Sequence, residues 1–309
     1  MIYEYHTPVL LRETIHFLQP GPDKICVDGT LGGGGHAEAI AKEFSGSGQL
    51  IAFDRDADAI FFAKRRLHGF GERIKFVHDN FSRMKTQLTA LGISEVDGIL
   101  LDLGVSTHQL QEASRGMSFQ QEARLDMRMD QNQRLDAWTV VNTYEERALA
   151  RVFWEYGEER DSRKIASEIV RERQQSPIET TEELRKVIRR VISGKFTQKS
   201  LARVFQAIRI EVNGELENLS RSLQDMPALL RSGGRILVMS YHSLEDRIVK
   251  DFFKEESRTC LPSGSKYLPD QPLQPRLRIV TKKPIMAAPD EVQINSRARS
   301  AKLRVAEKV

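Results

Sequence analysis

Residues 28–36 read Asp-Gly-Thr-Leu-Gly-Gly-Gly-Gly-His, and this stretch decides the fold. It joins the apolar segment at residues 25–28 to a helical pattern over residues 37–44. Glycine permits a positive φ and lets a ligand approach the backbone closely, and the first turn of a helix offers unpaired N–H groups. The stretch therefore predicts a strand, a ligand-binding glycine turn and a helix.

The same alternation of strand and helix continues after the turn. Further strands are expected at residues 49–54, 74–78 and 96–103, with helical patterns over residues 57–67 and 81–91 between them. A helical pattern covers residues 207–230, and the strands resume at residues 233–240. Two final strands are expected within residues 276–282 and 301–306. Such alternation predicts an α/β fold, with a mostly parallel Rossmann-like sheet and helices on both faces.

Between the fourth and fifth strands the strand pattern is interrupted. Residues 113–201 contain no convincing buried strand, whereas apolar residues recur at helical spacing, as at Leu149, Val152, Phe153 and Tyr156. Residues 180–183 read Thr-Thr-Glu-Glu, which is typical of a helix N-terminus. We therefore expect a catalytic domain of residues 1–112 and 202–309, with an inserted helical substrate-recognition domain at residues 113–201.

Composition indicates a globular protein, with 40% hydrophobic and 29% charged residues. No apolar run approaches the ~20 residues that span a bilayer, and residues 1–22 lack the layout of a signal peptide. The only two cysteines, Cys26 and Cys260, lie far apart in the sequence and support neither a disulfide framework nor a thiolate metal site. A cytoplasmic protein without a metal ion is expected.

Positive charge gathers near the C-terminus. Residues 258–309 hold 11 Lys and Arg against 4 Asp and Glu, a net charge of +7, while the whole chain carries only +4. This pattern suits binding of a polyanion such as nucleic acid, and the alternative is a solvated surface. The predicted insertion is nearly neutral, so RNA binding there would depend on local basic residues such as Arg185, Lys186, Arg189, Arg190, Lys195 and Lys199.

Two carboxylates frame the glycine turn. Asp54 ends the second strand, where a carboxylate can accept both hydroxyls of a ribose, although it can also be a strand-end cap. Gly32, Gly34 and Ala37 together with Asp54 also satisfy a dinucleotide fingerprint, which leaves a nicotinamide-dependent oxidoreductase as an alternative. Asp28 favours S-adenosylmethionine, because a carboxylate there suits a cationic amino-acid group and opposes a pyrophosphate.

Ten segments together resemble one family closely, in order along essentially the whole chain. They are HTPVLL (6–11), DGTLGGGGH (28–36), FDRD (53–56), GILLDLGVS (98–106), RGMSF (115–119), LDMRMD (125–130), YGEER (156–160), FQAIRIEVN (205–213), SYHSLEDRIVK (240–250) and RARSAKLRVAE (297–307). The chain resembles the bacterial 16S ribosomal RNA (cytosine-N4) methyltransferase family, formerly called MraW.

The resemblance implies a class I S-adenosylmethionine-dependent methyltransferase fold with an inserted helical domain. It implies methyl transfer to N4 of cytosine 1402 in the decoding region of small-subunit ribosomal RNA, and we expect the assembled 30S subunit to be the substrate. The cofactor positions that carry over are Gly34, Gly35, His36, Asp54, Phe81, Asp102 and Gln109. The Thr107-His108 pair before Gln109 departs from the Ser-Pro that the family pattern leads us to expect.

Asp102 ends the fourth strand, where amino-methyltransferases bind their acceptor. The N4 lone pair of cytosine is delocalised into the ring, so a carboxylate that accepts an N4 proton would assist the attack. Asp102 is followed by Leu-Gly-Val, without the prolines and the aromatic residue of many DNA-modifying relatives, which leaves a purely cofactor-holding role open. A non-catalytic RNA-binding factor with the same fold is a further alternative.

Three other features near the expected site remain open in the sequence. Tyr241 and His242 follow the fifth strand and are expected to stack on the cytosine or hydrogen-bond to it, although Tyr241 can instead pack in the core. The LDMRMD segment alternates charged and apolar residues. It can order a loop over the active site or form a structural salt-bridge cluster that joins the two domains, and the sequence does not choose.

Overall fold

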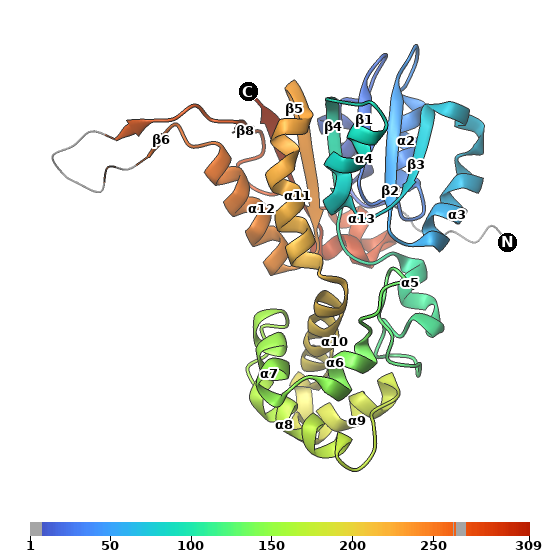
Figure 1. Cartoon of the computed structure of the whole chain (residues 1–309), viewed down its shortest axis with the longest axis vertical. Coiled ribbons are helices and arrows are strands. Elements are labelled where there is room, and N and C mark those ends of the chain that lie inside the picture. Colours follow the sequence, from blue (N-terminus) through green and yellow to red (C-terminus); the bar gives the residue numbers. More distant parts are fainter. Residues whose placement is uncertain (1–7, 262, 264–269) are drawn as a thin grey trace. The chain divides into compact units, whose positions relative to one another are not determined.

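The computed structural model describes residues 8–261, 263 and 270–309 and divides the chain into two compact units. One unit comprises Met1–Gly104 and Leu216–Val309, and the other comprises Val105–Glu215. Figure 1 labels the helices and strands of both. Of the ten family segments, the first begins with His6 and Thr7, which lie outside the described residues.

A seven-stranded sheet, with strand order β3-β2-β1-β4-β5-β9-β8, forms the centre of the first unit. The parallel strands are β1 (Ile25–Asp28), β2 (Gln49–Asp54), β3 (Ile74–His78), β4 (Val96–Asp102) and β5 (Leu230–Ser240). β9 (Lys302–Lys308) runs antiparallel to both β5 and β8 (Leu277–Ile279). The predicted Rossmann-like α/β sheet is confirmed, and its carboxyl edge carries Asp28, Asp54 and Asp102.

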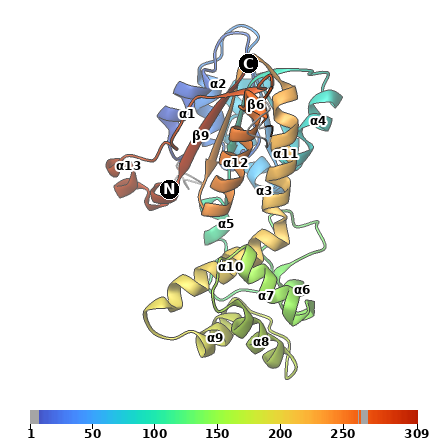
Figure 2. The ribbon, with the colours of Figure 1, turned by 90° about the vertical axis from the view of Figure 1, so that its left-hand side faces the viewer.

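Helices cover both faces of this sheet. Alternate side chains of each strand enter two separate cores, so that Cys26 and Leu100 lie in one core and Val27 and Leu101 in the other. The first core also takes α1 (Leu11–Leu18), α2 (Gly35–Lys42) and α3 (Ala57–Arg66). The second takes α4 (Met84–Ala90), α11 (Glu215–Leu229) and α12 (Ser243–Glu256). Figures 1 and 2 show α11 and α12 together on one face, and Figure 2 shows α1 and α2 across β9 from them.

Shorter elements complete the first unit. β6 (Cys260–Leu261) and β7 (Gln271–Pro272) form a separate two-stranded sheet, and α13 (Pro289–Ile294) precedes β9. Part of the Pro-, Gly- and Ser-rich stretch between β6 and β7 lies outside the described residues. Cys26 is buried, Cys260 is exposed, and both are free thiols.

The second unit is helical. It contains α5 (Thr107–Gln111), α6 (Ala137–Thr143), α7 (Glu146–Glu155), α8 (Ser162–Arg173), α9 (Thr181–Val191) and α10 (Thr197–Asn213). Its core is built from their apolar faces, including Leu149, Val152 and Phe153. Thr180 caps α9 by accepting the backbone N–H of Glu183, whose side chain in turn accepts the N–H of Thr180. The capping signal in the sequence therefore marks a real helix start.

Two boundaries differ from the sequence-based expectations. The predicted insertion at residues 113–201 lies inside the second unit, which also includes residues 105–112 and 202–215. α10 begins at Thr197 and continues to Asn213, so the unit has no break at residue 201. The helical pattern expected from Ala207 to Leu230 is interrupted at Gly214, whose φ of 56° places it in the left-handed region and ends α10.

Within the part of the chain that the structure describes, no helix is long and apolar enough to cross a membrane.

Candidate functional site

The glycine turn joins the carboxyl end of β1 to the N-terminus of α2. Gly34 has a φ of 75° and forms the N-cap of α2, a conformation that favours glycine. A Cβ atom on Gly29 would lie 2.4 Å from Cδ2 of Leu101 and 3.2 Å from Cβ of Phe81, which leaves no room for a side chain. The turn therefore packs tightly against β4 and lies beside Phe81, whose assignment to the cofactor stays a prediction.

Asp54 holds the turn from the end of β2. Its Oδ2 accepts the backbone N–H of Gly32 at 2.8 Å, and its Oδ1 accepts the N–H of Asp56 at 2.9 Å. Burial raises the pKa of Asp54 to about 6. Each carboxylate oxygen has two lone pairs, so these bonds leave capacity for the hydroxyls of a ribose.

Asp28 is the most deeply buried carboxylate of this edge, at 1% exposure. Its Oδ1 accepts the N–H of Thr30 at 3.0 Å, whereas Oδ2 has no hydrogen-bond partner among the described residues. Burial, with smaller contributions from the charges of Asp102 and Asp54, raises the pKa of Asp28 to about 7. A buried acceptor without a partner, among other carboxylates, is suited to a cationic ligand.

Asp102 lies at the centre of a hydrogen-bond network. Its backbone N–H donates to Oγ1 of Thr30 at 2.6 Å, and its Oδ1 accepts the phenol O–H of Tyr241 at 2.7 Å. Its Oδ2 lies 3.5 Å from Nδ1 of His36. Burial raises the pKa of Tyr241 well above its usual value, so the phenol keeps its proton and remains a donor to Asp102. Asp102 thus links the glycine turn to the end of β5.

His36 is buried in the first turn of α2. Its Nε2 lies 3.0 Å from the carbonyl oxygen of Val9. Burial lowers the pKa of His36 to about 4, because desolvation disfavours the imidazolium. The imidazole is therefore neutral near pH 7, and its two ring nitrogens face Val9 and Asp102.

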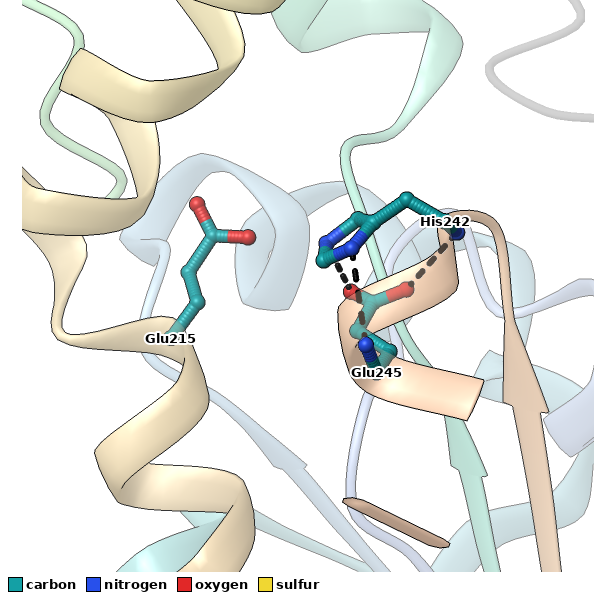
Figure 3. A group of neighbouring side chains, drawn as sticks. All are labelled: Glu215, His242 and Glu245. Atoms are coloured by element: carbon teal, nitrogen blue, oxygen red, sulfur yellow. Dashed lines mark hydrogen bonds and ion pairs between the residues drawn. The ribbon is translucent and has the colours of Figure 1, made fainter. Parts of the chain in front are cut away.

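Tyr241 and His242, which follow β5, make different contacts. The Tyr241 hydroxyl binds Asp102, and a Cβ atom on Gly104, whose φ is 101°, would lie 3.3 Å from its ring. His242 is the N-cap of α12: its Nδ1 accepts the N–H of Glu245 at 3.5 Å, and its Nε2 lies 3.1 Å from Oε1 of Glu245 (Figure 3). The prediction that these two residues contact a cytosine stays a prediction.

Gln109 belongs to the second unit, in the short helix α5. Its side chain accepts the N–H of Ser106, and its own N–H donates to the Ser106 hydroxyl, which forms a capping box. Gln109 is 6% exposed. The capping role is by itself a sufficient reason for a glutamine at position 109. The assignment of Gln109 to the cofactor stays a prediction.

The LDMRMD segment forms a salt-bridge cluster within the second unit. Arg128 makes two bonds to Asp126, with distances of 2.9 Å and 2.7 Å, and also donates to the carbonyl oxygens of Gln131 and Gln133. The buried amide of Asn213 donates to the carbonyl of Met127 and accepts the N–H of Met129. These contacts form a structural cluster whose members all belong to the second unit, whereas the sequence-based alternatives were a loop over the active site and a link between the two domains.

Ion pairs compensate part of the basic surface expected to bind RNA. In the second unit Arg185 pairs with Glu182 and Arg190 with Glu172, while Lys186, Arg189, Lys195 and Lys199 are exposed, with no ion pair among the described residues. Near the C-terminus Arg276 pairs with Glu256, Arg278 with Glu307, and both Lys302 and Arg304 with Asp246. The basic C-terminal segment therefore offers less uncompensated charge than its composition suggests.

The sequence model of the MraW methylase family matches residues 4–309. The chain belongs to this family. Membership confirms the family resemblance and the methyltransferase fold class.

Curated members of the MraW methylase family cover this chain almost completely. A protein named Ribosomal RNA small subunit methyltransferase H from Clostridium botulinum is 48% identical over 306 residues, which is 98% of this chain and 99% of the relative. The protein of the same name from Clostridioides difficile is 45% identical over 308 residues, 99% of each.

Solved structures show a more distant likeness. An rRNA methylase from Streptococcus thermophilus matches with a TM-score of 0.45 and 11% identity, over 100% of this chain and 99% of its own. TrmN from Thermus thermophilus matches with a TM-score of 0.44 and 12% identity, over 97% of this chain and 48% of its own.

Three residues of this candidate site are absent from the sequence-based set. Gly29 is required by its close approach to Leu101, Thr30 joins Asp28 to Asp102, and Arg297 is a half-buried cation whose charge acts on Tyr241. Gly29 and Thr30 lie inside the glycine turn of residues 28–36, so their place in the sequence could have identified them as site residues. Nothing in the sequence links Arg297 to Tyr241, because 56 residues separate them.

Proposed function

We propose that this chain uses S-adenosylmethionine to methylate small-subunit ribosomal RNA, at N4 of cytosine 1402 in the decoding region. The reaction on small-subunit ribosomal RNA is the one in the names of its curated relatives. The single observation that carries the proposal is the row of carboxylates Asp28, Asp54 and Asp102, which end adjacent strands around a glycine turn. We further propose that the assembled 30S subunit is the substrate and that the inserted helical domain recognises it.

The residues present fit S-adenosylmethionine. Bound there, it supplies an electrophilic methyl group on a sulfonium sulfur. Asp54 would hold the ribose hydroxyls, the turn from Gly32 to Gly35 would receive the cofactor closely, and Phe81 would pack against the adenine. The unpartnered Oδ2 of Asp28 would accept the cofactor's ammonium group, which would relieve the repulsion among the three carboxylates. A pyrophosphate would add negative charge to this edge and would be disfavoured.

Asp102 is placed to act on the acceptor amine. An N4 that donates one proton to a carboxylate gains electron density as it attacks, and the carboxylate receives the proton when the new bond forms. Tyr241 fixes the orientation of this carboxylate through its 2.7 Å bond to Oδ1. A carboxylate held in one orientation favours the reactive geometry, and positioning of this kind contributes a large part of the rate enhancement in such reactions.

The test of this function is methyl transfer from labelled S-adenosylmethionine to 30S subunits that lack the modification, with naked 16S RNA in parallel. Nucleoside mass spectrometry is expected to find N4-methylcytidine at position 1402, with faster transfer to the subunit. Label at another base or position would refute the assigned target, and no transfer at all would favour a non-catalytic RNA-binding factor. Binding of NAD in place of S-adenosylhomocysteine would favour the oxidoreductase.

Cofactor affinity is expected to depend on pH through Asp28. Because its pKa is about 7 without ligand, Asp28 is mostly protonated at pH 6 and mostly ionised at pH 8. A bound ammonium group lowers that pKa, so binding releases a proton and affinity rises with pH. The Kd of S-adenosylhomocysteine should fall by about tenfold from pH 6 to pH 8.

Calorimetry in two buffers of different ionisation enthalpy measures both this Kd and the number of protons released. Asp28→Asn should flatten the dependence, whereas Asp58→Asn, at an exposed position of α3, should keep it. Equal Kd values at pH 6 and pH 8 for the wild-type protein would contradict an ionised Asp28 as the ammonium partner.

RNA binding is expected to depend on salt through the exposed cations of the second unit. Lys195 and Lys199 flank Phe196, which is 60% exposed with its ring 5.3 Å from the Lys195 ammonium. Exposed aromatics beside cations stack on unpaired bases. Replacing both lysines by Ala should reduce the salt dependence of 30S binding. The slope of the logarithm of the binding constant against the logarithm of the salt concentration should become shallower by about 0.7–0.9 for each phosphate contact that is lost.

Filter binding between 50 and 300 mM salt measures this slope. Lys164→Ala is the matched control, because Lys164 belongs to the same unit but is already paired with Asp161. A flat salt profile for the wild-type protein would count against phosphate contacts altogether.

A further inference from the structure

A buried histidine faces the proposed proton acceptor in a way that fixes its chemical role. A backbone carbonyl can only accept, so the 3.0 Å contact between Nε2 of His36 and the Val9 oxygen requires the proton to be on Nε2. The other ring nitrogen, Nδ1, then carries a lone pair, and it lies 3.5 Å from Oδ2 of Asp102. Two acceptors that face each other in a buried site are stabilised when a proton is placed between them.

We propose that His36 is a positioning residue that stabilises the protonated form of Asp102 during methyl transfer. The inference rests on the proposed function, because it assigns the destination of the N4 proton. The N4 lone pair forms the new N–C bond as the methyl–sulfur bond breaks, and that bond's electron pair stays on sulfur as a neutral thioether. The N4 proton passes to Oδ2 of Asp102, and the resulting carboxyl O–H donates to Nδ1 of His36.

The surroundings keep His36 in the form that this role needs. Burial holds its pKa near 4, so the imidazole stays neutral at the pH of ordinary assays. Tyr241 already donates to Oδ1 of Asp102, which directs the incoming proton to Oδ2, on the side of His36. The 3.5 Å separation is long for a hydrogen bond, and such contacts shorten when the reacting complex forms.

Other charged groups act on the same pair from every neighbouring element. Asp28 and Asp54 end β1 and β2, Glu245 lies in α12 and raises the pKa of Tyr241, and Arg297 lowers it. Glu291 in α13 accepts the N–H of Leu10 and raises the pKa of His36. They are the same in wild type and His36 variants, so a change on substitution of His36 reports on His36 itself.

The first test reads the tautomer without any reaction. Side-chain ¹⁵N NMR of the histidine-labelled wild-type protein should show His36 protonated on Nε2 and bare on Nδ1, with His36→Gln used for assignment. A proton on Nδ1 would overturn the proposal, because His36 would then donate to an ionised Asp102 and could not stabilise its protonated form.

The second test separates chemistry from binding. His36→Gln keeps a donor that can reach Val9 but places no acceptor at the Nδ1 position, whereas His36→Asn places a side-chain amide there. Single-turnover transfer to 30S subunits at saturating cofactor should slow by about tenfold or more in His36→Gln and less in His36→Asn. Thermal unfolding and the Kd of S-adenosylhomocysteine verify that each variant is folded and loaded.

The pH profile provides a readout that a purely structural role would not move. A hydrogen bond to the neutral carboxyl raises its pKa, so loss of the acceptor should shift the acid limb of the rate profile down by about one pH unit. A wild-type rate and profile in a folded, cofactor-binding His36→Gln would overturn the proposal. A wild-type protein that transfers no methyl group would instead refute the proposed function, and the NMR result would still decide the tautomer.

Discussion

Asp102→Asn is expected to lower the single-turnover rate of methyl transfer to 30S subunits by about 10²- to 10⁴-fold at saturating cofactor. The replacement preserves shape and contacts: the amide oxygen can still accept the Tyr241 hydroxyl, and the amide nitrogen can donate to Nδ1 of His36. What it removes is the capacity to take up a proton. The expected loss is therefore chemical, with the protein folded as before.

Quench-flow measurement of labelled methyl transfer gives the rate, and calorimetry with S-adenosylhomocysteine gives cofactor affinity for the same variant. Asp97→Asn is the control, because Asp97 lies in the same strand but binds the N–H of Ile25 and the side chain of Arg231. An unchanged rate in Asp102→Asn would assign Asp102 to cofactor binding alone. A lost affinity with a normal rate at saturation would lead to the same conclusion.

Gly116→Ala is expected to destabilise the second unit by about 2–5 kcal/mol. Gly116 has a φ of 61°, and a Cβ atom there would lie 2.2 Å from the carbonyl oxygen of Arg124. The left-handed conformation costs a non-glycine residue about 1–2 kcal/mol, and overpacking against a backbone carbonyl adds about 1–3 kcal/mol. The clash is with backbone, so no side-chain rotation relieves it.

Gly194→Ala separates the two costs. Gly194 belongs to the same unit and has a φ of 77°, but a Cβ atom there would meet nothing within 4 Å. It should therefore lower the free energy of unfolding by only about 1–2 kcal/mol. Urea unfolding followed by circular dichroism measures both variants. Equal losses in the two would mean that the contact with Arg124 adds nothing.

The sheet was predictable because each strand is a short apolar run bounded by clear signals. Ile25–Asp28, Gln49–Asp54 and Ile74–His78 begin and end where the sequence places them. The strand ends also placed Asp54 and Asp102 at one edge, since parallel strands share their carboxyl ends. The boundary between α10 and α11 was missed although its determinant is local, because Gly214 ends α10 in the left-handed conformation and the apolar pattern continues on both sides of it.

The side-chain contacts across the site could not be predicted from the sequence. The bond between Tyr241 and Asp102 joins residues that are 139 positions apart, and only the pairing of β4 with β5 brings them together. The role of Asn213 depends in the same way on the path of residues 127–129. The charge count overstated the basic surface for a related reason. The net charge of +7 for residues 258–309 includes cations that ion pairs compensate locally.

The position of β9 has a consequence for how this protein is made. β9 lies between β5 and β8, so neither of those strands can complete its pairing before residue 308 has been synthesised. The second unit is contiguous and ends at Glu215, so its whole sequence is available 93 residues earlier, roughly 5–20 s at ribosomal elongation rates. Once β5 has been synthesised, at residue 240, it exposes an unpaired edge until β9 follows, and such an edge is a surface that aggregates. The growing chain is therefore most vulnerable to misassembly, and most in need of a chaperone, after its helical unit is complete and before its last strand is inserted.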